Sequence, residues 1–548
     1  MFDNTKPNVI ILADYTDTLA MGKTLGPYKV AHVLRVHGFQ VAVIHHLSAF
    51  RKEEIFSMLS QMISDQTLFV GINNFFYQLI NDLPPSTDGS ITFTEIQPGA
   101  MLPHGVKYNK DLKKIIQDKN PKCKLVLGGP TAIDVPYNKD FDYVVMGYAE
   151  ISIVNLAKHL LDSSVALKKS HRSLYGPIVI NDSKAESFDF SQSTMEYTDH
   201  DGILPGETLI LEVGRGCIFK CSFCSYPLNG KKKLDFIRHR DLIYKELIDN
   251  YNRFDVTKYL FVDDTVNDSV EKCQMIYEIS KLLPFKLEWW GYIRRDLMAA
   301  HPETIDMLFE SGLRCAFFGI ETLNPRTASA VGKGGNRERL LSTIKYIKDR
   351  WGDSVSLHGA FVYGLPYETA ETLEKTTNFL LSDENPLDSY QVKELHLRDK
   401  NGIEFLSDMD LNYKKYGYDL ISDDVVANDP RYSYIKYPNY LMWKTDNFDF
   451  LSIVDLVKEI QRKAMLTRKN KVNGLYSFFI AGLGLPLETT LNKYTIDVPW
   501  HEVDMQKLKR ALLYKHTVFK NFNIHCDITI EDELMKYNTF GEYLQDQQ

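Results

Sequence analysis

Three cysteines, Cys217, Cys221 and Cys224, lie close together in the stretch LEVGRGCIFKCSFCSYP. Thiolates are the usual ligands of iron in iron–sulfur clusters, and a cubane cluster presents four irons. Three cysteines therefore leave one iron open. An open iron can chelate the amino and carboxylate groups of a methionine-type ligand, which places its sulfonium beside a source of electrons. The spacing predicts a four-iron, four-sulfur ([4Fe-4S]) cluster that carries out reductive chemistry.

A structural zinc site is the main alternative, and the sequence offers it no fourth ligand. Structural zinc sites are closed tetrahedra of four Cys or His side chains. His239 is the nearest candidate, but it stands in a helix-like context without a partner at zinc-finger spacing. A catalytic cysteine nucleophile would not need three thiols. The solitary Cys123, Cys273 and Cys315 are expected to be buried as small hydrophobic residues.

The triplet directly follows an apolar strand, so its cysteines lie where that strand ends. Parallel α/β structure is predicted from Thr208 to about 382, because amphipathic helices separate the apolar runs. The predicted strands are 208–213, 258–262, 286–292, 314–319 and 356–363. We therefore expect residues 205–382 to form a partial, TIM-like (β/α)6 barrel, since a full eight-fold barrel needs about 250 residues. Barrel enzymes place their chemistry at the carboxyl ends of the strands.

Residues 1–165 are predicted to form a doubly wound, Rossmann-like parallel sheet. It begins with the apolar run Val9 to Leu12 and a helix from Pro27 to His37. Strands that are apolar throughout are typical of parallel sheets covered by helices on both faces. In such sheets a ligand lies at the carboxyl ends of the strands. The polar stretch 166–204 is predicted to be a linker.

Residues 383–548 are predicted to be a mainly helical region that caps the open barrel mouth and selects the substrate. The Tyr- and Asp-rich segment 408–440 and Trp443 are the candidates for that role, although aromatic residues in such segments more often serve packing. The apolar stretch 474–486 is shorter than the about 20 residues that a membrane-spanning helix needs. We expect it to be a buried helix.

The composition indicates the cellular compartment and the classes of partner to expect. Apolar residues make up 44%, charged residues 25%, and the formal net charge is -8, which argues against nucleic acid as a partner. Seven cysteines in so long a chain do not form a disulfide framework. The N-terminus enters a strand-like run without a signal-type segment. A cytoplasmic protein without membrane association is expected.

The cysteine stretch resembles that of the radical S-adenosylmethionine (radical SAM) enzymes, with Phe223 at the aromatic position of their Cys-x-x-x-Cys-x-aromatic-Cys signature. The resemblance covers residues 205–382. It continues at four stretches that look like successive strand ends of the family's barrel: YLFVDDTV (259–266), WWGYIRRD (289–296), LFESGLRCAFFGIET (308–322) and VYGLPYET (362–369). The resemblance implies that the cluster cleaves S-adenosylmethionine reductively.

The same resemblance implies binding roles for individual residues. The backbone of Phe223 would contact the adenine, Glu321 the ribose or amino group, and Arg294 the carboxylate of S-adenosylmethionine. Physical chemistry agrees in part, because guanidinium groups suit carboxylates and carboxylates accept from hydroxyls. Gly364 and Pro366 would shape the adenine pocket. Asp263 and Asp264 are left open between ligand contacts and a helix N-cap.

The N-terminal sheet resembles the cobalamin-binding domain that precedes many radical SAM enzymes. The residues that carry this resemblance are Gly26 before Pro27, Gly128 and Gly129 before Pro130, and the turn from Gly147 to Glu150. One departure is the first loop, Asp14-Tyr15-Thr16-Asp17-Thr18, which lacks the Asp-x-His-x-x-Gly motif of other cobalamin proteins. The resemblance implies cobalamin as a further cofactor, with a cofactor-free scaffold as the alternative.

Together, these resemblances favour cobalamin-dependent methyl transfer to an unactivated carbon. A cobalamin-associated radical rearrangement or cyclisation stays open, as does a non-catalytic iron–sulfur or corrinoid carrier or sensor. Sulfur insertion usually goes with a second cluster, and the remaining cysteines are not grouped to hold one. The expected partners are an external electron donor of flavodoxin or ferredoxin type and a small-molecule or modified-biomolecule substrate. No residue pattern identifies that substrate.

Overall fold

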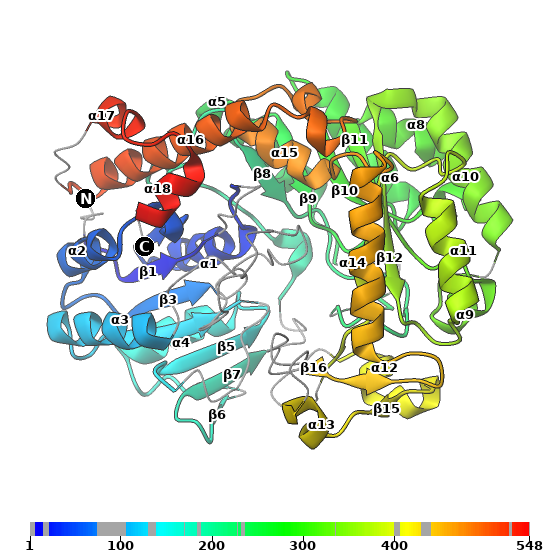
Figure 1. Cartoon of the computed structure of the whole chain (residues 1–548). Coiled ribbons are helices and arrows are strands. Elements are labelled where there is room, and N and C mark those ends of the chain that lie inside the picture. The colour runs from blue at the N-terminus through cyan, green and yellow to red at the C-terminus, as the bar shows by residue number, and fades with distance from the viewer. Residues whose placement is uncertain are drawn as a thin grey trace.

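A computed structural model of the chain gives two parallel sheets side by side, with the C-terminal helices packed against both (Figure 1). It describes residues 6–14, 21–73, 106–129, 139–168, 170–182, 188–226, 228, 230–231, 236–334, 336–398, 406–428, 440–524 and 529–546. The overall class is the expected one: a Rossmann-like sheet, a partial barrel and a helical C-terminal region.

Five parallel strands of the N-terminal sheet lie side by side in the order β2-β1-β3-β4-β5. These strands are β1 (Val9–Leu12), β2 (Val41–Ile44), β3 (Phe69–Asn73), β4 (Lys124–Gly128) and β5 (Tyr143–Gly147). The covering helices are α1 (Leu25–Val36), α2 (Lys52–Met62), α3 (Val106–Lys119) and α4 (Ser152–Leu161). In β1, Val9 packs with α1 and α4 whereas Ile10 packs with α2 and α3, so both faces are buried. This confirms the doubly wound sheet.

The stretch 166–204 is not the linker expected from its polar composition. β7 (Ile178–Asp182) pairs in parallel with β5, and β6 (Ser170–Arg172) pairs antiparallel with β7 at the edge. The following residues are also packed, since Phe190 and Tyr197 belong to the hydrophobic core. The prediction failed because an exposed edge strand such as Ser170–Arg172 carries polar side chains and so looks like a loop.

The second sheet is an open barrel of parallel strands in sequential order, which confirms the partial (β/α)6 architecture. Its described strands are β8 (Thr208–Leu211), β9 (Lys258–Phe261), β10 (Glu288–Ile293), β11 (Leu313–Glu321), β12 (Ser356–Tyr363) and β13 (Ser389–Glu394). The helices between them include α5 (Arg240–Phe254), α6 (Val270–Leu282), α7 (Arg295–Ala300), α8 (Glu303–Glu310), α9 (Pro325–Ala330), α10 (Arg337–Trp351) and α11 (Ala370–Leu380).

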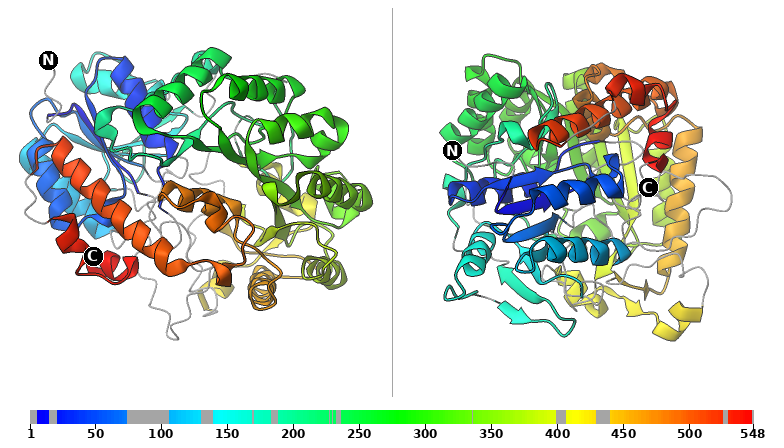
Figure 2. Two further views of the ribbon diagram at one scale, coloured as in Figure 1. Left: turned by 90° about the horizontal axis from the view of Figure 1, so that it is seen from above. Right: turned by 90° about the vertical axis from the view of Figure 1, so that its left-hand side faces the viewer.

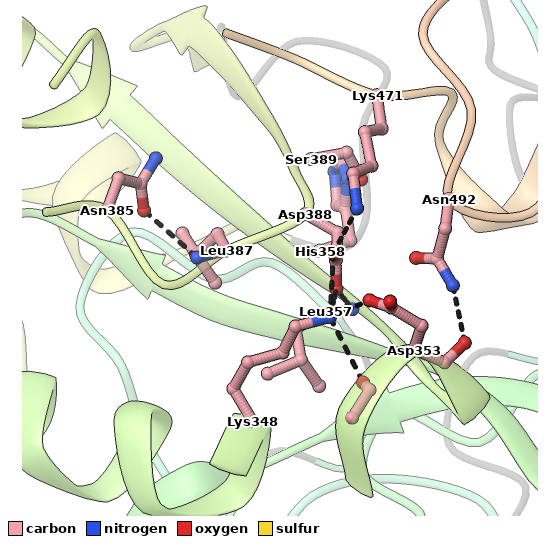
Figure 3. Close-up of polar contacts among 11 residues, drawn as sticks. Lys348, Asp353, Leu357, His358, Asn385, Leu387, Asp388, Ser389, Lys471 and Asn492 are labelled. Carbon is pink, nitrogen blue, oxygen red and sulfur yellow. Dashed lines mark hydrogen bonds and ion pairs between the residues drawn. The ribbon is translucent and has the colours of Figure 1, made fainter. Parts of the chain in front are cut away.

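The sixth strand lies beyond the boundary expected at residue 382. β13 pairs with β12 along its whole length. Figure 3 shows Asp388, directly before β13, accepting hydrogen bonds from the Nζ atoms of Lys348 at 2.8 Å and Lys471 at 2.8 Å. The backbone amide of Leu357 donates to the same carboxylate at 3.0 Å. The barrel therefore extends into the region that was predicted to be only a cap.

Helices of the C-terminal region pack against both sheets. α14 (Phe450–Leu466) packs on β13, and α15 (Gly474–Gly482) contacts β8 to β11 on the face opposite the barrel helices. α15 is buried, as expected, and within the described ranges no helix is long and apolar enough to cross a membrane. α16 (Trp500–Asn521), α17 (Ile530–Leu534) and α18 (Phe540–Asp546) cover the N-terminal half (Figure 2). The region is therefore more than a cap.

Candidate active site

The cysteine loop leaves the carboxyl end of β8 and reaches toward the ends of the neighbouring strands. The Sγ atom of Cys217 lies 3.2 Å from Oγ1 of Thr265, which follows β9. The Sγ atom of Cys221 lies 3.8 Å from the carbonyl oxygen of Gly332, beyond β11. The amide of Cys224 donates to the carbonyl of Cys221 at 3.0 Å, and all three cysteines are partly exposed. The thiols thus lie at the expected end of the barrel.

The three thiols of the loop are the type of ligand that binds iron in iron–sulfur clusters. Among the described residues, no three His, Cys, Asp or Glu side chains converge closely enough to hold one metal ion. Thiolates that bind different irons of a cubane need not converge on one point. His239, the candidate fourth zinc ligand, has a mostly exposed side chain and caps α5 instead.

The solitary cysteines are buried, as expected. Burial raises the pKa of Cys123 and of Cys273 to about 12, and it also raises the pKa of Cys315. Thiols held neutral in this way are poor metal ligands. They contrast with the partly exposed cysteines of the loop.

Arg294 lies beside the second cysteine of the loop. Its Nη1 atom is 3.7 Å from the Sγ atom of Cys221, and its guanidinium stacks on the ring of Phe219 at 3.7 Å. Its Nε and Nη2 atoms donate to Asp296 at 2.9 Å and 2.6 Å. Burial alone would raise the pKa of Asp296, but the hydrogen bonds and charge of Arg294 hold it below its ordinary value. Contact between Arg294 and a ligand carboxylate stays a prediction.

Lys333 lies near both Glu321 and Phe223, two residues that belong to separate sequence motifs. Glu321 ends β11 after an irregularity in the strand register and has a left-handed backbone, with φ at 69°. Its Oε1 atom lies 3.0 Å from Nζ of Lys333, which also donates to the carbonyl of Gly319 at 2.9 Å. The same ammonium lies 5.8 Å from the ring centroid of Phe223. Sequence reasoning missed Lys333, although the flanking Gly332 and Gly334 signal a tight turn.

Packing accounts for the glycine in the VYGLPYET stretch. Gly364 has φ at 87°, and a Cβ atom there would lie 2.5 Å from the ring of Trp443. Its amide donates to Glu368 at 2.9 Å, and the carbonyl of Pro366 accepts from Thr327 Oγ1 at 2.8 Å. Burial raises the pKa of Glu368 to about 8, against the hydrogen bonds that it accepts. The expected roles of Gly364 and Pro366 at the adenine stay predictions.

Neither of the two aspartates after β9 is a helix N-cap, because Ser269 caps α6. Asp263 is buried, accepts from the amide of Val213 at 2.8 Å and pairs with Lys272 at 2.6 Å. Burial, followed by the charge of Asp263, raises the pKa of Asp264 to about 7, while a hydrogen bond from the amide of Gly216 opposes that rise. Asp264 therefore lies next to the cysteine loop.

The glycines expected to meet a cofactor in the N-terminal sheet lie at its carboxyl edge. Gly129 and Gly147 have φ at 111° and 77°, values that favour glycine, at the ends of β4 and β5. Gly26 near the start of α1 has open space where a Cβ would stand, and Gly128 has ordinary room. Ligands of doubly wound sheets bind at this edge, where glycine lets the backbone approach a ligand closely. Residues 15–18 and 130–131 lie outside the described ranges.

Glu150, expected to contact a cofactor, is paired with the cysteine loop. Its carboxylate receives a hydrogen bond from Nη2 of Arg215, two residues before Cys217. Glu150 therefore has a protein partner, and its contact with a cofactor stays a prediction. Sequence reasoning missed Arg215, because nothing local to either motif indicates a pairing across 65 residues.

Comparison with known proteins decides what the barrel is. Residues 211–380 match the family model described as the radical SAM superfamily. The chain contains a radical SAM domain. An uncharacterized methyltransferase of Pyrococcus horikoshii is 26% identical over 292 residues, which are 48% of this chain and 59% of that protein. The anaerobic magnesium-protoporphyrin IX monomethyl ester cyclase of Rubrivivax gelatinosus is 25% identical, over 52% of this chain and 54% of its own length.

Solved structures extend the similarity in fold beyond the radical SAM domain. The methyltransferase TsrM from Kitasatospora setae, bound to tryptophan and a SAM analogue, matches 83% of this chain and 89% of its own, with a TM-score of 0.55 at 14% identity. The cobalamin-dependent radical SAM enzyme OxsB with bound aqua-cobalamin matches 99% of this chain and 78% of its own, with a TM-score of 0.54 at 13% identity. The two-sheet architecture is thus shared with both.

One further cation lies beside the cysteine loop. Arg398 follows β13, and its Nη1 atom donates to Oγ of Ser225, next to Cys224. Its backbone amide donates to Asp410 at 2.8 Å. Sequence reasoning missed this residue because it placed the end of the barrel at 382. The signal that marks it is the strand Ser389–Glu394, which precedes it.

Proposed function

We propose that the chain is a radical SAM enzyme that binds a [4Fe-4S] cluster through Cys217, Cys221 and Cys224 and catalyses cobalamin-dependent methyl transfer. One observation carries the proposal. The cysteine loop lies at the carboxyl ends of the barrel strands, within contact distance of residues that follow β9, β10 and β11. A site of this kind gathers groups from several strands around one ligand.

When bound, the cluster supplies the electron for reductive cleavage of S-adenosylmethionine. The chain's own residues would bind and orient that cosubstrate. Glu321, held by Lys333, offers a carboxylate to hydroxyl or amino donors, and its neighbour Phe223 offers backbone and ring to the adenine. For the carboxylate of S-adenosylmethionine, Arg294 beside Cys221 supplies positive charge.

Cobalamin would occupy the carboxyl edge of the N-terminal sheet, where Gly26, Gly128, Gly129 and Gly147 leave the backbone accessible. Cobalamin supplies a transferable methyl group when bound. His45, beyond β2, is engaged through both ring nitrogens: Nδ1 accepts from the amide of His46 at 2.9 Å, and Nε2 lies 3.2 Å from Oγ1 of Thr24. We therefore expect His45 not to ligate cobalt. The names of TsrM and OxsB support this cofactor by analogy of fold.

The substrate is proposed to be a small molecule or a modified biomolecule, and the electron donor a flavodoxin or ferredoxin in the cytoplasm. A cyclisation is the second candidate, because two relatives in the comparison are magnesium-protoporphyrin ester cyclases. Product analysis separates the two. Methyl transfer adds one carbon to the substrate, whereas ring closure conserves its carbon count.

Anaerobic reconstitution of the full chain tests the proposal. We expect about four irons per chain, an electron paramagnetic resonance (EPR) signal that changes on addition of S-adenosylmethionine, bound corrinoid, and release of 5′-deoxyadenosine or S-adenosylhomocysteine. Stoichiometric zinc would contradict the cluster. Cluster assembly without calorimetric binding of S-adenosylmethionine would favour the carrier alternative.

A further inference from the structure

Arg215 belongs to the barrel but is held by the N-terminal half of the molecule. Its guanidinium is buried between the rings of Tyr148 and Phe190, each at 4.5 Å from ring centroid to Cζ. Glu150 of the N-terminal sheet accepts from Nη2. Glu212 of the barrel accepts from Nε at 2.6 Å. This side chain therefore crosses the boundary between the two sheets.

The backbone of Arg215 is rigidly joined to the first cysteine. Gly216 between them has φ at 77°, and a Cβ atom there would lie 2.6 Å from the side chain of Leu228. The carbonyl of Arg215 accepts from Nζ of Lys231 at 2.8 Å, and the carbonyl of Cys217 accepts from the amide of the same lysine at 3.2 Å. A displacement of Arg215 is thus transmitted to Cys217.

The outer part of the loop is anchored in the barrel instead. Nζ of Lys231 also pairs with Asp268 at 3.1 Å, and both side chains are buried. The amide of Arg215 donates to the carbonyl of Phe236 at 2.9 Å. The loop therefore has two anchors, one in each half of the molecule.

Arg215 and Glu150 form a buried ion pair at the N-terminal anchor. Burial would raise the pKa of Glu150, but the charge and hydrogen bond of Arg215 hold it below its ordinary value. Removal of one partner leaves the other charge buried without compensation, which is costly in protein interiors. Lysine replaces arginine poorly here, because an ammonium lacks the planar fork that can serve two carboxylates and stack between two rings.

We propose that Arg215 is a positioning residue that fixes the cysteine loop, and with it the cluster, against the N-terminal half. The inference rests on the proposed function and deepens it, because it makes the properties of the cluster depend on a contact with the other sheet. Glu150 is then the residue of the N-terminal half that holds Arg215, and we call this Arg215–Glu150 pair the clasp. A small displacement of a group that must be positioned for catalysis can lower the reaction rate by up to about 100-fold.

The test uses full-length, reconstituted Arg215→Gln, Arg215→Lys and Glu150→Gln proteins. A matched control is Arg35→Gln, which removes another guanidinium–carboxylate pair between the N-terminal half and residues 190–204, since Arg35 donates to Asp201 at 2.7 Å and 2.8 Å. Readouts are iron content, melting temperature, the midpoint potential and EPR spectrum of the reduced cluster with and without S-adenosylmethionine, and cleavage rate.

We expect Arg215→Gln and Glu150→Gln to keep their iron, shift the cluster potential and EPR response, and slow cleavage by at least about tenfold. Arg215→Lys should fall between them and the wild type, and Arg35→Gln should change the melting temperature alone. Unchanged potential and EPR spectra in both clasp variants overturn the proposal, as does an equal change in Arg35→Gln. If a glutamine variant does not fold, Glu150→Asp, which shortens the clasp, must show the same spectral shift. A wild type without cluster or cleavage instead refutes the proposed function.

Discussion

Glu321 and Lys333 form a partly shielded ion pair, with Oε1 and Nζ 3.0 Å apart, that joins the end of β11 to the loop against which Cys221 lies. Glu321 also has a left-handed backbone conformation, which costs a non-glycine residue free energy. Strain of this kind persists where the surrounding contacts over-determine it. The pair therefore gives a carboxylate beside the cysteine loop a fixed position.

Replacement of Lys333 by methionine should weaken binding of S-adenosylmethionine. The apolar stem is retained, but Glu321 loses the ammonium that orients it. A hydrogen bond to a charged group contributes about 1.5–3 kcal/mol, so the dissociation constant should rise roughly tenfold or more, as it should for Glu321→Gln. Calorimetric titration measures this. Lys345→Met is the control, because its pair with Asp349 is exposed on α10. A Lys333→Met dissociation constant within about twofold of wild type would contradict the assignment.

Cysteine replacements should separate cluster ligands from packing residues. Single alanine replacements at Cys217, Cys221 or Cys224 should lower iron from about four per chain to a small fraction. Cys273→Ala should retain the iron and lose about 1 kcal/mol of stability, because Cys273 is buried within the hydrophobic core. Iron analysis and denaturant unfolding give the two readouts. Loss of iron from Cys273→Ala would place a ligand outside the loop.

The features that could be predicted from the sequence are those that depend on residues close together along the chain. The apolar strands and the spacing of the three cysteines around Phe223 could be recognised without knowledge of distant residues. β13 was missed, because its ladder is fixed by pairing with β12 and by Asp388, which Lys348 and Lys471 neutralise from distant segments. Hydrogen bonds of this kind depend on sequence separations that no local pattern encodes.

The clasp between the two sheets was hidden for the same reason. Glu150 was predicted to be a site residue because of the turn in which it lies. Its partner Arg215 was not predicted to have any role. The helical tail was predicted, but not that the hydroxyl of Tyr514 in α16 accepts a hydrogen bond at 2.7 Å from the backbone amide of His45, directly after β2. Burial of a polar group in a sheet-to-helix contact becomes visible only when both elements are in place.

Stability should depend on pH through Glu368. Burial raises its pKa in the folded chain to about 8, above the ordinary value of 4.5, so the folded state binds more protons between these two pH values. Stability is therefore expected to fall as pH rises from about 4.5 through about 8, by an amount on the order of a few kcal/mol. Glu368→Gln keeps the acceptor for the amide of Gly364 and removes the titration. The fall in melting temperature between pH 6 and pH 8.5 should be smaller in this variant, and equal falls would show that Glu368 is not the group responsible.

Replacement of Gly364 by alanine should destabilise the fold through backbone strain and through a steric clash. Comparison with Gly417 separates these two effects. Both Gly364 and Gly417 have φ near 87°, at 87° and 86°, but only Gly364 faces a close neighbour, since the Cβ site at Gly417 is open. An alanine in this conformation costs roughly 1–2 kcal/mol, and the clash with the buried Trp443 adds about 1–3 kcal/mol. Gly364→Ala should therefore lower the free energy of unfolding more than Gly417→Ala does, by that second amount. Denaturant titrations of both variants measure the difference. Equal losses would mean that Trp443 moves aside freely and that packing does not explain the glycine at 364.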